Sequence, residues 1–237
     1  MLDDSNVTET DTETDMMDDL RRYCRMAALA LLCLAASGLA QAHPHGWIDL
    51  RMRLVVNDEG QLTGLHQSWL MDPFYSLVVM EELGRASGEG GMEAALDQLG
   101  SEIRDNLVGY GYYTELHLDG DKQSFDPVND YTVLERNGRV EFIFLLPLAE
   151  PQPLAGQALS YKVFDPTYYI EIAHEDESGV PADGSLRVGG ELDCETRIHQ
   201  ADPDPEMVMR AAMLDVTDEA EPGLGRHFAE TGEVVCR

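Results

Sequence analysis

The stretch WIDLRMRLVVNDEGQLTGLHQSWLM, residues 47–71, decides the fold. In residues 47–56 every second side chain is apolar, which is the pattern of a strand with one buried face. The four residues that follow, Asn57-Asp58-Glu59-Gly60, are typical of a turn. Residues 61–71 are therefore expected to return as the second strand of a hairpin.

The register of this hairpin has two alternatives. If residues 57–60 form a four-residue loop, His45 lies opposite Asp72 and Trp69 faces the core. If Gly60 forms a bulge after a three-residue loop, Trp69 shares the face of Trp47 and Asp49. A shift of one residue moves every side chain to the other face, and the sequence leaves both registers open.

Helical signals follow the hairpin. Asp72-Pro73 is typical of a helix start, with a capping oxygen and a proline at the first helical position, and Gly84 is a suitable end. After a glycine-rich break, apolar residues spaced three and four apart predict a second helix over 92–107. The rest of the chain predicts strands over 114–118, 128–135, 139–146, 159–164, 168–173, 185–197 and 233–236, and a short helix after Asp204-Pro205. We expect an α+β fold: an antiparallel sheet or sandwich with two helices inserted after an N-terminal hairpin and a short C-terminal helix.

Residues 1–42 are expected to be a signal peptide with an acidic N-terminal extension. Arginines at 21, 22 and 25 precede an apolar run over 26–39, and Ala40-Gln41-Ala42 has the small residues that signal peptidase requires. The apolar run is shorter than the roughly 20 residues of a membrane-spanning helix. We therefore expect a single exported domain over 43–237, located in the periplasm and not integral to a membrane.

Charge and cysteine content agree with export. The chain carries a net charge of −29, and removing the eight acidic residues and three arginines of residues 1–42 leaves −24. Such an acidic protein is poorly suited to bind nucleic acid. Cys194 and Cys236 remain after cleavage, and an even pair in an exported chain predicts a disulfide.

The sequence His43-Pro44-His45 is the candidate metal site. Both histidines fall on the polar face of the first strand, and Pro44 favours an extended backbone that turns the two imidazoles to one side. Such a pair suits Zn²⁺, Ni²⁺ or Cu²⁺, with Asp49 as a third ligand. If cleavage follows Ala42, the amine of His43 adds a nitrogen that can form a chelate with its own ring.

Five further candidate ligands each have an alternative role. Asp72 is also a helix cap, and Asp165 also closes a turn through its side chain. His66, His117 and His174 are histidines on predicted strands, and the last two are also interpreted as solvent-facing residues. The sequence contains no nucleophile elbow, phosphate loop, dinucleotide fingerprint or metalloprotease motif, so it supports no hydrolase or nucleotide-dependent enzyme.

Several segments together resemble the domain-of-unknown-function family 1007. They are residues 42–49 (AHPHGWID), Trp69 followed by a helix, residues 106–114 (NLVGYGYYT), residues 164–169 (FDPTYY) and a closing cysteine near Phe228-Ala229. Members of this family are often labelled periplasmic components of ABC-type transport systems and accompany nickel, cobalt or zinc transporters. The resemblance therefore implies a role in metal handling. An aspartate-rich stretch of many relatives is absent after the first helix, where this chain has residues 84–91.

Three hypotheses follow. The first is a non-enzymatic periplasmic metal-binding accessory of transition-metal (Zn, Ni or Co) transport, with an inner-membrane transporter as its partner. The second is a copper enzyme with an amino-terminal histidine chelate. The third is a metal-free interaction module that docks on a membrane transporter.

Overall fold

The computed structural model describes residues 21–26, 44–86, 90–214, 221 and 223–237. The chain divides into two compact units, Met1–Gln41 and Ala42–Arg237. Residues 21–26 of the first unit are helical, and the rest of the predicted signal peptide lies outside the described residues, as does His43. All that follows concerns the second unit.

The predicted hairpin is confirmed as β1 (Gly46–Val56) and β2 (Gln61–Met71). Leu50 lies opposite Trp69, and a bulge between Val55 and Val56 shifts the register near the turn. Trp69 faces the core and is only 2% exposed, which is the orientation expected for the four-residue loop. The turn itself is closed by the Asn57 nitrogen donating to the Gln61 carbonyl oxygen, with Gly60 at a φ of +75°, so neither expected register holds over the whole hairpin. The predicted pairing of His45 with Asp72 is wrong, because the bulge places the backbone nitrogen of Asp72 at 3.0 Å from the carbonyl oxygen of Trp47.

The hairpin is the centre of the first sheet. Its strand order is β11-β1-β2-β6-β5, with β5 over Asp130–Arg136 and β6 over Arg139–Pro153. Two short strands, β8 (Ile170–His174) and β11 (Leu186–Val188), pair in parallel with successive parts of β1. The start of β1 is therefore held between β2 and β8.

The second sheet has the order β12-β13-β7-β3-β4 and pairs its strands antiparallel. The strands are β3 (Thr114–Leu118), β4 (Asp121–Lys122), β7 (Ala158–Val163), β12 (Cys194–His199) and β13 (Thr231–Cys236). A separate small ribbon pairs β9 (Asp176–Glu177) with β10 (Val180–Pro181). The predicted disulfide is confirmed, since Cys194 and Cys236 are bonded at directly paired positions of β12 and β13.

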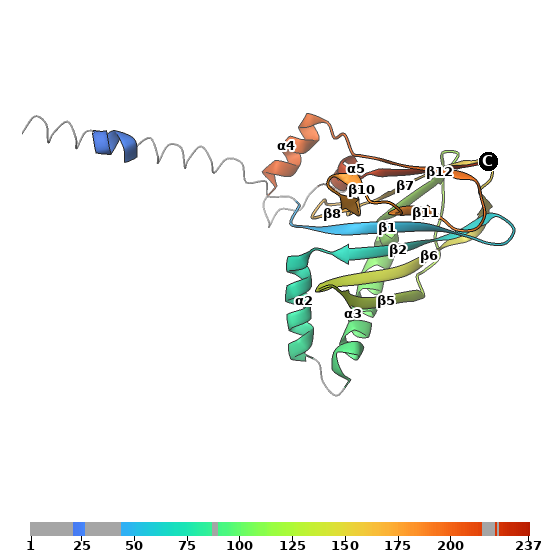
Figure 1. The fold of residues 1–237 in the computed structure, drawn as a ribbon, viewed down its shortest axis with the longest axis horizontal. Coiled ribbons are helices and arrows are strands. Elements are labelled where there is room, and N and C mark those ends of the chain that lie inside the picture. The colour runs from blue at the N-terminus through green and yellow to red at the C-terminus, as the bar shows by residue number, and fades with distance from the viewer. Residues whose placement is uncertain (1–20, 27–43, 87–89, 215–220, 222) are drawn as a thin grey trace, which may run out of the picture. The chain divides into compact units, whose positions relative to one another are not determined.

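One hydrophobic core joins the two sheets, which confirms the α+β sandwich. It contains the inward face of the hairpin together with residues of the second sheet such as Leu116, Leu159 and Val234. Two helices, α2 (Pro73–Ala86) and α3 (Gly91–Leu107), lie side by side below the first sheet in Figure 1. α3 packs on β5 through Gly100, where a Cβ would come within 3.1 Å of the Tyr131 ring and of Val133.

The remaining helices are short. A 3-10 helix, η2 (Val108–Tyr113), continues α3 and leads into β3. Near the C-terminus lie α4 (Pro205–Met213), which is the predicted short helix, and α5 (Leu224–Phe228), which the sequence pattern did not predict. These two helices pack together around Ala211 and Leu224.

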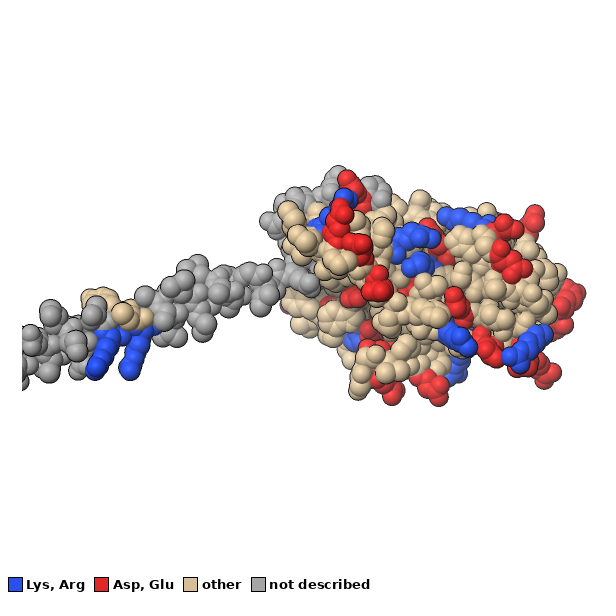
Figure 2. Space-filling model, turned by 90° about the horizontal axis from the view of Figure 1, so that it is seen from above, with Lys and Arg blue, Asp and Glu red and all other residues tan. Residues whose placement is uncertain are grey.

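Acidic side chains are scattered over the surface of this unit. On the face that Figure 2 shows, aspartates and glutamates lie in several places with lysines and arginines between them. Like the sequence, this face indicates a solvated acidic surface and no single acidic patch.

Candidate functional site

Four segments that are distant in the sequence meet at one pocket of about 490 Å³. We call it the aromatic pocket and define it by His45, Trp47, Trp69, Asp72, Tyr113 and Tyr169. These residues come from the entry into β1, the junction of β2 and α2, the end of η2 and the turn before β8. The segments are those that carried the family resemblance, so the pocket is the candidate functional site.

His45 lies at this pocket with its backbone fixed. Its nitrogen donates to the carbonyl oxygen of Tyr169 at 2.9 Å, and its ring centroid is 4.6 Å from that of Tyr169. The side chain is exposed. The first histidine that the structure describes is therefore held next to the turn that precedes β8.

Asp72 lines the same pocket, and the interpretation of this residue as a helix cap is confirmed. Its Oδ1 accepts hydrogen bonds from the backbone nitrogens of Phe74 and Tyr75, both at 2.9 Å. Its Oδ2 faces Gly46, where a Cβ would come within 2.9 Å of that oxygen. One carboxylate oxygen thus caps α2 while the other lies beside the residue that follows His45.

Asp165 fixes the turn that carries Tyr169, a residue of the pocket lining. It accepts hydrogen bonds from the backbone of Thr167, Tyr169 and Ile170 and from the Thr167 hydroxyl, so the interpretation of its side chain as the closure of a turn is confirmed. Burial, together with the negative charge of Asp165, raises the pKa of Tyr113 to about 12. The Tyr113 phenol is therefore neutral at physiological pH.

Asp49 lies outside this arrangement. Its Oδ2 accepts from Arg139 at 2.7 Å, and the same guanidinium donates to the carbonyl oxygens of Leu70 and Met71. A metal ion at Asp49 would compete with the Arg139 guanidinium for this carboxylate.

The remaining histidine candidates also lie apart from the pocket. His66 lies on β2 opposite Arg53, and burial, followed by the charge of Arg53, lowers its pKa. His117 lies on a strand, β3, as predicted, and its side chain is half-buried. Within the described part of the chain, no three His, Cys, Asp or Glu side chains form a cluster that could hold a metal ion. Two donors, His45 and Asp72, share the pocket, and imidazole with carboxylate is a donor set that suits Zn²⁺ or Ni²⁺.

His174 is buried, so its interpretation as a solvent-facing strand residue is wrong. Its Nδ1 is 2.7 Å from Glu230, and its Nε2 is 2.6 Å from the Tyr161 hydroxyl. The side chain of Gln200 also donates to Glu230. Both ring nitrogens thus have partners inside the sandwich, and we interpret this network as structural.

From the hydrogen bonds between His174 and Glu230, we expect Glu230 to contribute to the change in stability of the fold at acid pH. Burial raises the pKa of Glu230, but hydrogen bonds from the His174 ring, the His174 amide and Gln200 outweigh burial and bring this pKa below its usual value of 4.5. A lowered carboxyl pKa stabilises the fold above the usual value, and this contribution is lost as the pH falls through the folded-state pKa. We expect Glu230→Gln to flatten the fall in free energy of unfolding below pH 4.5, measured by urea denaturation at a series of pH values. Glu233→Gln, at an exposed ion pair, is the control; equal slopes in the wild type and Glu230→Gln would contradict the assignment.

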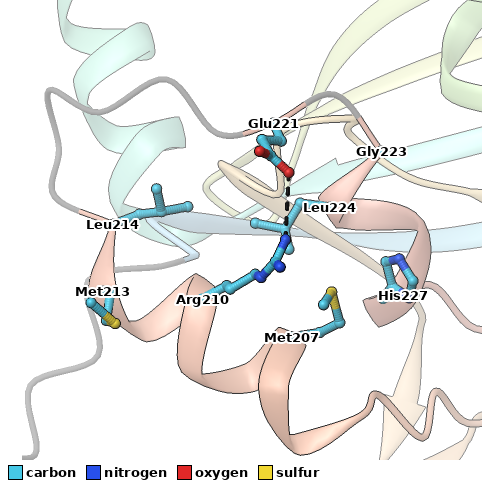
Figure 3. Close-up of a pocket in the computed structure, with 8 residues that line it drawn as sticks. All are labelled: Met207, Arg210, Met213, Leu214, Glu221, Gly223, Leu224 and His227. Carbon is cyan, nitrogen blue, oxygen red and sulfur yellow. Dashed lines mark hydrogen bonds and ion pairs between the residues drawn. The ribbon is translucent and has the colours of Figure 1, made fainter.

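A second cavity of about 670 Å³ lies between α4 and α5 (Figure 3). Arg210 reaches across it toward Glu221 at 3.5 Å, and Met207 and His227 line its other side. No sequence pattern singled out these residues. Residues 215–220 and 222, which come between α4 and α5 in the sequence, lie outside the described residues.

No helix among the residues described is long and apolar enough to cross a membrane.

An uncharacterised protein of Haemophilus influenzae is 26% identical over 209 residues, which cover 87% of this chain and 97% of that protein. A crystal structure of AChBP from Bulinus truncatus covers 84% of this chain and 92% of its own, but its 9% identity and TM-score of 0.27 carry no argument about fold or ligand. The family model described as "Protein of unknown function (DUF1007)" matches residues 28–236. The chain therefore belongs to the DUF1007 family.

Proposed function

We propose that the protein is a non-enzymatic periplasmic accessory of transition-metal transport, and that it binds one divalent ion at the mouth of the aromatic pocket. The observation that supports this most is that His45 and Asp72 line one pocket, with Oδ2 of Asp72 beside Gly46. In this proposal His43, two residues before His45 in the sequence, supplies a second imidazole.

Asp72 is a better carboxylate for this site than Asp49. Asp72 uses Oδ1 to cap α2, which fixes the carboxylate without occupying Oδ2 in that cap. The carboxylate of Asp49, in contrast, is already paired with the cation of Arg139, which a metal ion would have to compete with. A ligand whose position is fixed by a second interaction loses less conformational freedom when the metal binds.

The test is a titration of the mature protein, secreted from its own host, after its intact mass has fixed the first residue. Calorimetry with Zn²⁺, Ni²⁺ and Cu²⁺ is expected to give submicromolar binding of one ion per protein. The His43→Ala/His45→Ala variant is expected to lose this binding because it removes both imidazoles.

A matched control is His199→Ala, since His199 forms a 2.8 Å pair with Glu233 on the exposed face of β12 and β13. Binding that is weak and equal in all three proteins would overturn the metal proposal. Copper preference together with His43 as the first residue would favour the copper enzyme.

One observation favours the metal-free docking module as a second candidate. α2 exposes apolar side chains beside the aromatic pocket: Phe74 is 75% exposed and Leu77 is 64% exposed. Such side chains are typical of a surface that a partner covers. This candidate predicts that metal accumulation by cells survives His43→Ala/His45→Ala and is lost with Leu77→Glu; the reverse result would exclude it.

A further inference from the structure

The interior of the aromatic pocket is much larger than the space that a metal ion occupies. Its volume of about 490 Å³ falls within the range of small-molecule sites, roughly 300 to 1,000 Å³. Six aromatic side chains line it: Trp47, Trp69, Phe74, Tyr75, Tyr113 and Tyr169. Four of these, Trp47, Phe74, Tyr75 and Tyr169, are between 45% and 75% exposed, so a ligand can reach them from solvent.

Asp72 supplies the carboxylate of the lining. Among the described residues, no lysine or arginine lines the pocket. An anionic ligand would meet the carboxylate of Asp72 with no lysine or arginine to compensate for it, whereas a cationic ligand would be attracted.

Aromatic rings add a second attraction for cations. The face of each ring carries partial negative charge, and a cation above it within about 6 Å is stabilised, most strongly by tryptophan. An alkylated ammonium group combines this attraction with apolar surface that packs against the rings. A hydrated metal ion lacks such apolar surface.

We propose that the aromatic pocket binds a small organic cation with an alkylated ammonium group, held by the aromatic side chains and by the charge of Asp72. This binding goes beyond the proposed metal function and does not depend on it. The ammonium group needs no vacant coordination position and no imidazole nitrogen.

The experiment titrates the mature protein with choline in the presence of EDTA, which removes divalent ions. The same titration is made with the neutral carbon isostere of choline, in which a tert-butyl group replaces the trimethylammonium group. We expect choline to bind at least about tenfold more tightly than the isostere, because only choline carries the charge.

Two variants test the residues. Asp72→Asn keeps an oxygen that can cap α2 but removes the charge, and Trp47→Leu removes one ring; each is expected to weaken choline binding about tenfold. Asp204→Asn is the matched control, because Asp204 also caps a helix before a proline, accepting from Glu206 at 2.8 Å, and lies outside the pocket. It is expected to leave choline binding unchanged.

Each other outcome overturns this inference. Equal binding of choline and its isostere would mean that the pocket selects apolar shape alone, and no binding of choline would exclude the ammonium class. Choline binding that Asp72→Asn leaves unchanged would place the cation elsewhere. The His43→Ala/His45→Ala titration with metal ions reports separately on the proposed function, so the failure of one is distinct from the failure of the other.

Discussion

Replacing Trp69 by alanine is expected to lower the free energy of unfolding by about 3 to 5 kcal/mol, the usual cost of removing a buried aromatic side chain. Trp69 is 2% exposed, and its ring lies 5.2 Å from that of Phe144 and 6.2 Å from that of Tyr113. Its Nε1 donates to Gln67 at 2.9 Å, so the variant also leaves a buried amide oxygen without this donor. Urea denaturation followed by far-ultraviolet circular dichroism measures the loss without relying on tryptophan fluorescence.

The other tryptophan is a natural control. Trp47 is 47% exposed at the mouth of the aromatic pocket, so Trp47→Ala removes a ring of similar size with little cavity formation. We expect Trp47→Ala to change the free energy of unfolding by less than about 1 kcal/mol. Similar losses in the two variants would contradict the placement of Trp69 in the core.

Loss of the disulfide is expected to lower the free energy of unfolding by about 4 kcal/mol. Cys194 and Cys236 are 42 residues apart in sequence, and a bond that closes a loop of that length lowers the entropy of the unfolded chain, which destabilises the unfolded state by about this amount. β12 also lies at the edge of the second sheet, where β13 is its paired neighbour. The Cys194→Ala/Cys236→Ala variant should therefore unfold at lower urea concentration than the oxidised protein.

The reduced wild-type protein is the matched comparison for this variant. It has the same chain without the covalent bond, so its midpoint of unfolding should move toward that of the double variant when reductant is added. A double variant as stable as the oxidised protein would show that the bond contributes nothing to folding.

The regular alternation of apolar and polar residues made the hairpin predictable, but the sequence did not predict the bulge. Period-two alternation places Leu50 and Met52 on one face whatever the register, and both are buried. The register depends on an extra residue in β2, Thr63, which lies opposite the step from Val55 to Val56, and turn residues alone do not decide this. The sequence therefore predicted the strands of the hairpin but not which residue of β1 lies opposite Asp72.

The expected strand over 185–197 is two strands in different sheets, β11 and β12. Between them Gly189 lies against β1, where a Cβ would come 3.0 Å from the carbonyl oxygen of Leu54. Gly190 follows with a φ of +79°, which β-branched residues avoid. The two glycines were a usable sign of this break. The parallel pairing of β8 and β11 with β1 is a long-range contact that no local pattern encodes.

The sequence predicted several individual residues of the candidate site, but it did not predict that they lie together in one pocket. The sequence singled out His45, Asp72 and Asp165 and gave two of them the roles of cap and turn that the structure confirms. It did not predict that Phe74 and Tyr75 join them. The apolar side chain of Phe74 at an exposed position of a helix was the available signal. Burial of His174 was missed because its partners, Tyr161 and Glu230, come from other strands and loops.

The most direct test of the account is to locate the bound metal in the mature protein by nuclear magnetic resonance. Copper(II) is paramagnetic and broadens the amide signals nearest to it, so substoichiometric Cu²⁺ marks its own binding site. For a metal bound at the aromatic pocket, we expect the amides of Gly46, Trp47 and Tyr169 to lose intensity first, together with that of Asp72. Loss of intensity centred on the His199 and Glu233 pair, or spread evenly over the acidic surface, would contradict a metal site at the aromatic pocket.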